Sequence, residues 1–143
     1  MDRWVTDSSA ALTWCFEDEA TPATDSLLAR LRAGDEATVP THWPVEIANS
    51  LLVAIRRGRI SREKAVRFFQ DLRALPIRVE PESGRNAFDR VFAMALQYRL
   101  TAYDAAYLEL AIREGLALAT LDGDLRRAAR EAGVSLMDLK PTE

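Results

Sequence analysis

Apolar residues recur at intervals of three and four positions in several stretches of the chain, and short apolar runs separate these stretches. Such intervals predict amphipathic helices, as in PVEIANSLLVAIRRG (44–58) and SGRNAFDRVFAMALQYR (83–99). Pro22 near the start of another such stretch and Gly34 at its end fit the usual helix boundaries. Further helices are predicted over residues 9–18, 21–34, 61–75, 101–115 and 124–133.

The apolar runs between the helices predict strands. Strands that alternate with helices favour a parallel sheet covered on both faces, because right-handed crossovers return each helix onto the sheet. The sequence therefore predicts an α/β fold, an α/β/α sandwich with a central parallel sheet of about five strands. The predicted strands cover residues 3–7, 37–40, 77–81, 116–121 and 134–139.

Length and composition favour a single globular domain over residues 1–143, with 48% hydrophobic and 29% charged residues. No apolar run approaches the roughly 20 residues of a membrane helix. The N-terminus MDRWVTDSSA lacks a signal-peptide pattern, so we expect a cytoplasmic protein without membrane attachment. The single Cys15 and single His42 exclude an internal disulfide and a Cys/His zinc cluster. We expect Cys15 to be buried and His42 to lead into a helix.

The net charge gives no simple indication of a nucleic-acid partner. A formal charge of −3 and a pI near 5.3 differ from the basic balance of most nucleic-acid binders. A cation bound by several acids would change that balance. The basic residues are mostly arginines, gathered in 56–62 and 126–130. Arg56 and Arg57 either belong to a solvated helix face or make forked contacts with RNA phosphates or a partner's carboxylates.

Several acids occupy the ends of predicted strands or the starts of predicted helices. Asp7 and Asp122 follow strands, and Glu46 lies in the first turn of the helix after residues 37–40. Ligands of open parallel sheets bind at the carboxyl ends of the strands, so these three acids should emerge at one edge. Asp104 precedes its strand, and topology alone does not place it there.

Each acid also has a structural explanation. Asp7 and Asp122 suit helix N-caps, and Glu46 and Asp104 suit the positive end of a helix dipole, with Thr101 as the N-cap before Asp104. If the acids cluster, electrostatics opposes them: two carboxylates ~4 Å apart repel by about 4 kcal/mol at an effective dielectric near 20. Such a cluster raises its pKa values or recruits a cation, and oxygen ligands suit Mg²⁺ or Mn²⁺.

The segments VTDSSAALTW, PVEIANSLL, LTAYDAAYLELA and LATLDGDL resemble, in this order, the motifs of the PIN-domain family, especially its VapC-type toxin ribonucleases. The resemblance covers nearly the whole chain. It implies a PIN-like α/β/α fold and a Mg²⁺- or Mn²⁺-dependent endoribonuclease, a hydrolase of RNA phosphodiester bonds. It carries catalytic and metal-binding roles onto Asp7, Glu46, Asp104 and Asp122.

Other polar residues match supporting positions of the same family. Ser9, Asn49 and Thr120 match polar residues that support the acids. Thr120 lies two positions before Asp122, and Asn49 lies one helical turn after Glu46. Asp124 matches an extra acid of some relatives, although a surface position at a helix start explains it slightly better.

The resemblance also implies a cognate VapB-like antitoxin and a homodimer. We expect the antitoxin to bind along the helices at 44–58 and 61–75, where Arg56 and Arg57 border apolar residues. Some of these apolar residues must face the core. They are Trp43, Leu51, Leu52, Phe68 and Phe69.

Two alternatives stay open: a PIN nuclease of RNA processing without an antitoxin, and a non-catalytic binding module with an acidic pocket, such as a phospho-receiver. The receiver fits less well. It needs an acid pair after the first strand, where Ser8 follows Asp7, and a lysine after the last strand, for which only Lys140 is available.

Overall fold

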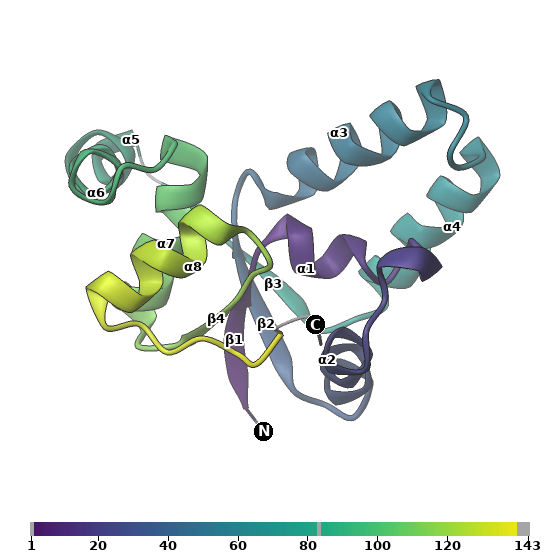
Figure 1. The fold of residues 1–143 in the computed structure, drawn as a ribbon, viewed down its shortest axis with the longest axis horizontal. Coiled ribbons are helices and arrows are strands. Elements are labelled where there is room, and N and C mark those ends of the chain that lie inside the picture. The colour runs from purple at the N-terminus through teal and green to yellow at the C-terminus, as the bar shows by residue number, and fades with distance from the viewer. Residues whose placement is uncertain (1, 83, 140–143) are drawn as a thin grey trace.

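A parallel sheet forms the centre of the computed structural model, which describes residues 2–82 and 84–139. In this part of the chain the sheet has four strands in the order β3-β2-β1-β4, and Val5 of β1 lies opposite Thr38 of β2 and Leu118 of β4 (Figure 1). The α/β prediction is confirmed. The strands are β1 (Arg3–Thr6), β2 (Glu36–Pro40), β3 (Ile77–Glu80) and β4 (Ala117–Ala119).

The predicted fifth strand, at residues 134–139, is reduced to a single bridge between Leu118 and Leu136. Leu118 of β4 makes two backbone hydrogen bonds with this segment: its N–H donates to the Ser135 carbonyl and its carbonyl accepts from the Met137 N–H, both at 2.9 Å. β4 has three residues, so its neighbour has little to pair with. Lys140 lies outside the described residues.

The helices follow the predicted order, with one break. The predicted helix at 9–18 is two short pieces, because the chain turns at Thr13–Cys15. Pro22 begins its helix, and Gly115 ends another in the left-handed conformation, with φ 65°. The helices are α1 (Ser8–Leu12), η1 (Glu17–Glu19), α2 (Pro22–Arg32), α3 (Trp43–Arg56), α4 (Arg62–Arg73), α5 (Gly84–Asn86), η2 (Ala87–Val91), α6 (Phe92–Tyr98), α7 (Ala102–Glu114) and α8 (Gly123–Ala132).

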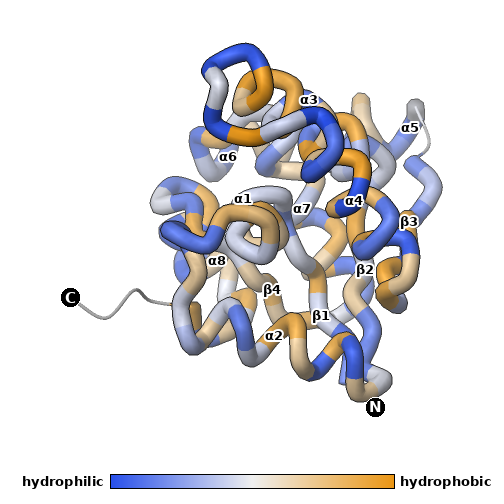
Figure 2. Tube along the Cα trace, turned by 90° about the vertical axis from the view of Figure 1, so that its right-hand side faces the viewer, coloured by the Kyte–Doolittle hydropathy of each residue, from blue (hydrophilic) through white to orange (hydrophobic). Residues whose placement is uncertain are grey.

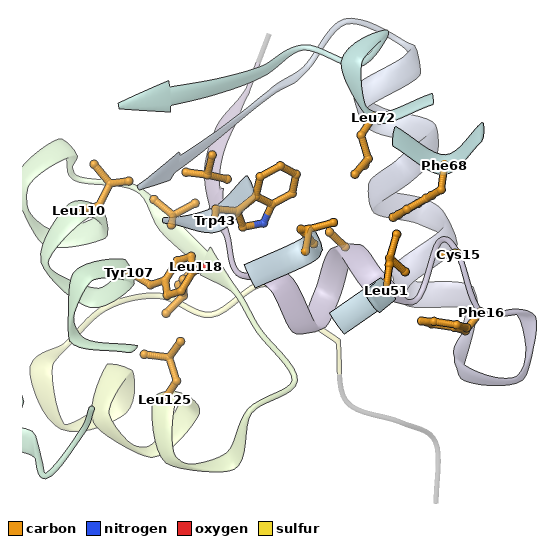
Figure 3. Packing of buried hydrophobic residues seen from close by; sticks show 14 of the residues in the cluster. Cys15, Phe16, Trp43, Leu51, Phe68, Leu72, Tyr107, Leu110, Leu118 and Leu125 are labelled. Atoms are coloured by element: carbon orange, nitrogen blue, oxygen red, sulfur yellow. The ribbon is translucent and has the colours of Figure 1, made fainter. Parts of the chain in front are cut away.

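Helices cover both faces of the sheet because strand side chains alternate between them. Trp4 of β1 belongs to a cluster with Leu27 and Leu31 of α2, whereas Val5 joins a larger cluster on the other face. The larger cluster runs from Leu125 and Tyr107 to Phe68 and Phe16, and Cys15 is buried in it, as predicted (Figure 3). Hydrophobic and hydrophilic segments alternate along the helices (Figure 2).

The segment from η2 to α6 exposes apolar side chains instead of burying them. Phe88, Phe92 and Leu96, spaced four positions apart, are all exposed, and Phe88 is 79% exposed. Val91 is the buried member of this segment. Within residues 2–82 and 84–139, no helix is long and apolar enough to cross a membrane.

Candidate functional site

Asp7 lies at the carboxyl end of β1, where the chain turns into α1. It is the N-cap of α1: its Oδ1 accepts a hydrogen bond from the Ala10 N–H at 3.0 Å. The Ser9 hydroxyl contacts both carboxylate oxygens, at 2.8 and 2.9 Å. Because the side chain is 4% exposed, these polar neighbours replace most of the water that a carboxylate would otherwise have.

A second set of hydrogen bonds joins Asp7 to the end of β4. The Thr120 hydroxyl donates to Asp7 Oδ2 and accepts from the Asp122 N–H at 3.0 Å. Ser9 Oγ also accepts from the Leu121 N–H, at 3.0 Å. The two predicted supporting residues Ser9 and Thr120 thus tie two strand ends together around one carboxylate.

Asp122 follows β4 and is the N-cap of α8, since its Oδ1 accepts from the Leu125 N–H at 2.9 Å. Capping therefore engages one carboxylate oxygen of Asp122, just as it engages Asp7. Asp124, two positions later, is exposed in the first turn of α8.

Glu46 lies in the first turn of α3 and is held from another element. The Tyr107 hydroxyl, on α7, donates a hydrogen bond to Glu46 Oε1. His42 Nε2 lies 3.5 Å from the same oxygen. Asn49, the third predicted supporting residue, is exposed and donates to none of the four acids in the described part of the chain.

Asp104 lies in the first turn of α7, and the Thr101 hydroxyl accepts from its N–H at 3.1 Å, as predicted for an N-cap. The direction of α7 explains why Asp104 lies near the other acids although it precedes its strand. A helix that returns to the start of the next parallel strand runs antiparallel to the sheet, so its N-terminus lies at the carboxyl edge of the strands. Asp104, in the first turn of α7, therefore lies at the same sheet edge as Asp7 and Asp122, which follow β1 and β4.

The charges of these acids affect one another. Burial, and after it the negative charges of Asp122, Glu46 and Asp124, together raise the pKa of Asp104 to about 6. Burial also raises the pKa of Asp7 to about 6, against the lowering effect of the Thr120, Ala10 and Ser9 hydrogen bonds.

Tyr107 acts as a fixed hydrogen-bond donor beside Glu46. Burial, the hydrogen bond to Glu46 and the charges of Glu46 and Asp7 all raise the pKa of Tyr107. The phenol therefore keeps its proton at neutral pH and goes on donating to the carboxylate. Tyr107 is a site residue that the motifs did not indicate, although its spacing of four from Tyr103 places the two tyrosines on neighbouring turns of α7, on either side of Asp104.

The donor chemistry fits a hard divalent cation. Asp7, Glu46, Asp104 and Asp122 offer carboxylate oxygens, and the mutual repulsion that raises the Asp104 pKa falls when a cation binds. Among residues 2–82 and 84–139, no three His, Cys, Asp or Glu side chains enclose an ion by themselves. Mg²⁺ suits such an open arrangement, since it binds few carboxylates and keeps several waters.

Comparison with known proteins agrees with this fold. The PIN domain family matches residues 5–131. Ribonuclease VapC12 of Mycobacterium tuberculosis is 31% identical over 87% of this chain and 90% of its own length. Ribonuclease VapC3 of Pyrobaculum aerophilum is 35% identical over 56% of this chain, and the aligned part spans only 61% of that relative.

Two solved structures resemble the fold. The crystal structure of PAE2754 from Pyrobaculum aerophilum superposes with a TM-score of 0.69 at 23% identity, over 89% of this chain and 79% of that chain. The structure of VapBC2 from Rickettsia felis, bound to a DNA fragment from its promoter, superposes with a TM-score of 0.66 at 11% identity, over 94% of this chain and 96% of that one. With the family match over most of its length, the chain belongs to the PIN-domain family.

Proposed function

We propose that the chain is an endoribonuclease that hydrolyses RNA phosphodiester bonds with Mg²⁺ or Mn²⁺ and acts as the toxin of a VapBC-type pair. The observation that carries the proposal is the gathering of acids at one sheet edge, where the Thr120 hydroxyl links Asp7 to the Asp122 N–H and the charges of Asp122 and Glu46 act on the half-buried Asp104. Similarity to Ribonuclease VapC12 over 87% of the chain supports the substrate class. A toxin that cleaves cellular RNA would act in the cytoplasm.

Each acid has a defined part in this proposal. Asp7, Glu46, Asp104 and Asp122 supply the oxygens that hold the cation. Ser9 and Thr120 orient Asp7, and Tyr107 orients Glu46. A bound Mg²⁺ or Mn²⁺ would lower the pKa of an attacking water and stabilise charge on the phosphate oxygens. Asp124 adds negative charge from the surface.

RNA cleavage by the purified chain tests the proposal. Cleavage of total cellular RNA should need Mg²⁺ or Mn²⁺ and stop in excess chelator. Asp104→Asn should lose about 100-fold or more, since the cation contributes several kcal/mol of charge stabilisation and each 1.36 kcal/mol is tenfold in rate. Asp89→Asn, on η2, is the matched control and should keep full activity. Full activity of Asp104→Asn, or of the unmodified chain in chelator, would overturn the metal-dependent nuclease mechanism.

We propose an amphipathic segment of a VapB-like antitoxin as the partner of α3 and α4. A groove of about 400 Å³ lies between α3, α4 and β3, lined by apolar residues that include Ile47 and Phe69, with Arg73 at its border. Trp43 lines the groove yet is largely buried, and Leu51 and Phe68 face the core. The solved VapBC2 complex of Rickettsia felis supports an antitoxin partner.

Pairing with a second copy of the chain is a separate proposal. Phe88, Phe92 and Leu96 form one exposed apolar stripe on η2 and α6. Two copies related by a twofold axis would cover both stripes at once, because such an interface uses the same patch twice. Sedimentation analysis of the unmodified chain and of Leu96→Glu tests it: the variant should be monomeric. An unmodified chain that is already monomeric would contradict the proposal.

A further inference from the structure

Tyr103 is an aromatic residue that stands out in solvent beside the acidic site. It precedes Asp104 in the first turn of α7, and it is 64% exposed. Val45 of α3 has the corresponding place before Glu46 and is 69% exposed. Of these two apolar neighbours of the acids, only Tyr103 offers a flat ring.

The Tyr103 ring is connected to Glu46 through two further rings. Its centroid lies 5.5 Å from that of His42, at an interplanar angle of 53°. His42 lies 5.0 Å from Tyr107, edge to face, and the Tyr107 hydroxyl donates to Glu46. Exposure increases along this series, from 1% at Tyr107 to 64% at Tyr103. Tilted and edge-to-face contacts of this kind are favourable, so the series fixes the outermost ring in place.

The chemistry of the site favours a partner that binds without relying on charge. The acids repel phosphate until a cation binds, and the chain carries a net charge of −3. Stacking of a nucleobase on an aromatic side chain contributes affinity that is independent of charge and tolerant of sequence. An unpaired base can be splayed out onto such a ring, whereas a base within a duplex cannot.

We propose that Tyr103, backed by His42, is a stacking platform for one unpaired nucleobase of the RNA strand that crosses the acidic site. The proposal rests on the proposed RNA cleavage. Tyr103 is a positioning residue here: it holds a base so that a neighbouring phosphate lies over the acids. Single-stranded RNA is then the preferred substrate, and one nucleotide near the cleaved bond is held by its base.

Cleavage of a short single-stranded RNA with a mapped cut tests the platform. Tyr103→Ala should lower kcat/KM by about 5- to 150-fold, the fold-change equivalent to 1–3 kcal/mol for one stacked base. Tyr103→Phe keeps the ring and should stay within about twofold. Val45→Ala removes apolar volume beside Glu46 and is the matched control, with little effect expected. Thermal melts should be similar for all variants, since both side chains are exposed.

A substrate series separates stacking from a structural effect. Abasic ribonucleotides are placed one at a time at positions around the cut, and the effect of Tyr103→Ala should vanish at the position whose base stacks. A Tyr103→Ala defect that persists on every abasic substrate would overturn the platform. Unchanged RNA cleavage with weakened antitoxin binding would overturn it too, by making Tyr103 a protein contact.

Binding without cleavage distinguishes failure of the platform from failure of the nuclease. With Mg²⁺ present and cleavage slowed by Asp104→Asn in every protein compared, 2-aminopurine at the stacked position should be quenched when Tyr103 is intact or replaced by Phe, and not when it is replaced by Ala. Quenching by the unmodified chain that never cleaves RNA would support the platform and overturn the nuclease. Equal quenching by Tyr103→Ala would overturn the platform alone.

Discussion

The Thr120 hydroxyl donates a hydrogen bond to the carboxylate of Asp7, a residue 113 positions earlier in the chain. This bond joins the end of β4 to the end of β1, which are neighbouring strands of the sheet. The same Thr120 oxygen accepts from the Asp122 N–H, so one hydroxyl contacts the carboxylate of one candidate acid and the backbone of another. The sheet thereby aligns carboxylates that the chain holds far apart.

Thr120→Val keeps the size of the side chain and removes the hydroxyl. Because the Thr120 hydrogen bond lowers the Asp7 pKa, which is already about 6, its loss should raise that pKa further. A hydrogen bond to a charged group contributes about 1.5 kcal/mol, so the acidic limb of the pH–activity profile should move up by about one pH unit. Thr120→Ser retains the donor and should keep the original profile. An unchanged profile in Thr120→Val would show that the bond does not tune Asp7.

In the metal-free protein, the raised pKa values make folding less favourable at higher pH. Asp7 and Asp104 both have a folded-state pKa of about 6 against an ordinary value of 3.8, so the folded state binds their protons more tightly than the unfolded state. Their contribution is fully present below about pH 4 and is lost as pH rises through about 6. The free energy of unfolding, measured by urea titration in chelator, should therefore fall across this range.

Asp104→Asn should remove part of this decrease in the free energy of unfolding at higher pH. At pH 7 the metal-free variant should be more stable than the unmodified chain by about 1 kcal/mol, less than the whole shift implies because Asp104 is partly exposed and solvent screens its charge. At pH 4 the two proteins should be equal. Asp124→Asn, exposed on α8, should change much less. A variant that is less stable than the unmodified chain at pH 7 would contradict repulsion among the acids.

Sequence patterns were sufficient for the order of the elements, because that order depends on local spacing, whereas the roles of the four acids stay a prediction from family motifs. The N-cap roles of Asp7 and Asp122 and their place at the sheet edge turned out to be compatible, since capping engages one carboxylate oxygen of each. The expected fifth strand was wrong in extent: the apolar run at 134–139 has a neighbour of three residues to pair with.

The partners of the acids were harder to predict. Tyr107 meets Glu46 across 61 positions, and no periodic pattern within either helix indicates that contact. Asn49 was expected from helical spacing to support Glu46, yet it points to the exposed side of α3. Residue spacing shows which side chains share a face of a helix. The way that α3 and α7 pack in the fold decides which of those faces points toward the acids.

Metal binding should depend on the same titrations. Protons and the cation compete for Asp7 and Asp104, so the apparent affinity for Mn²⁺ should weaken below pH 6, by up to about tenfold per pH unit for each competing proton. Isothermal calorimetry at pH 5, 6 and 7 measures this slope. In Asp104→Asn one competing proton is removed, so a weaker overall affinity should come with a shallower slope. An affinity that is independent of pH between 5 and 7 would exclude both acids as ligands.

Arg56 and Arg57 lie at the C-terminal end of α3, where both are exposed and, within residues 2–82 and 84–139, pair with no acid. Ala48, in the groove, is eight residues before Arg56, about 12 Å along the helix axis at 1.5 Å per residue. A partner must therefore be elongated to reach both the groove and the arginines.

Reversal of both charges (Arg56→Glu with Arg57→Glu) should weaken antitoxin or RNA binding by about 5- to 30-fold, as expected for two exposed charge contacts of up to 1 kcal/mol each. Calorimetry with the antitoxin, beside RNA binding at two salt concentrations, separates the partners: RNA contacts should also reduce the salt dependence. Arg32→Glu, at the corresponding end of α2, is the control, and metal affinity and fold should be unchanged in both variants. If both affinities equal those of the unmodified chain, these arginines form only a solvated helix face.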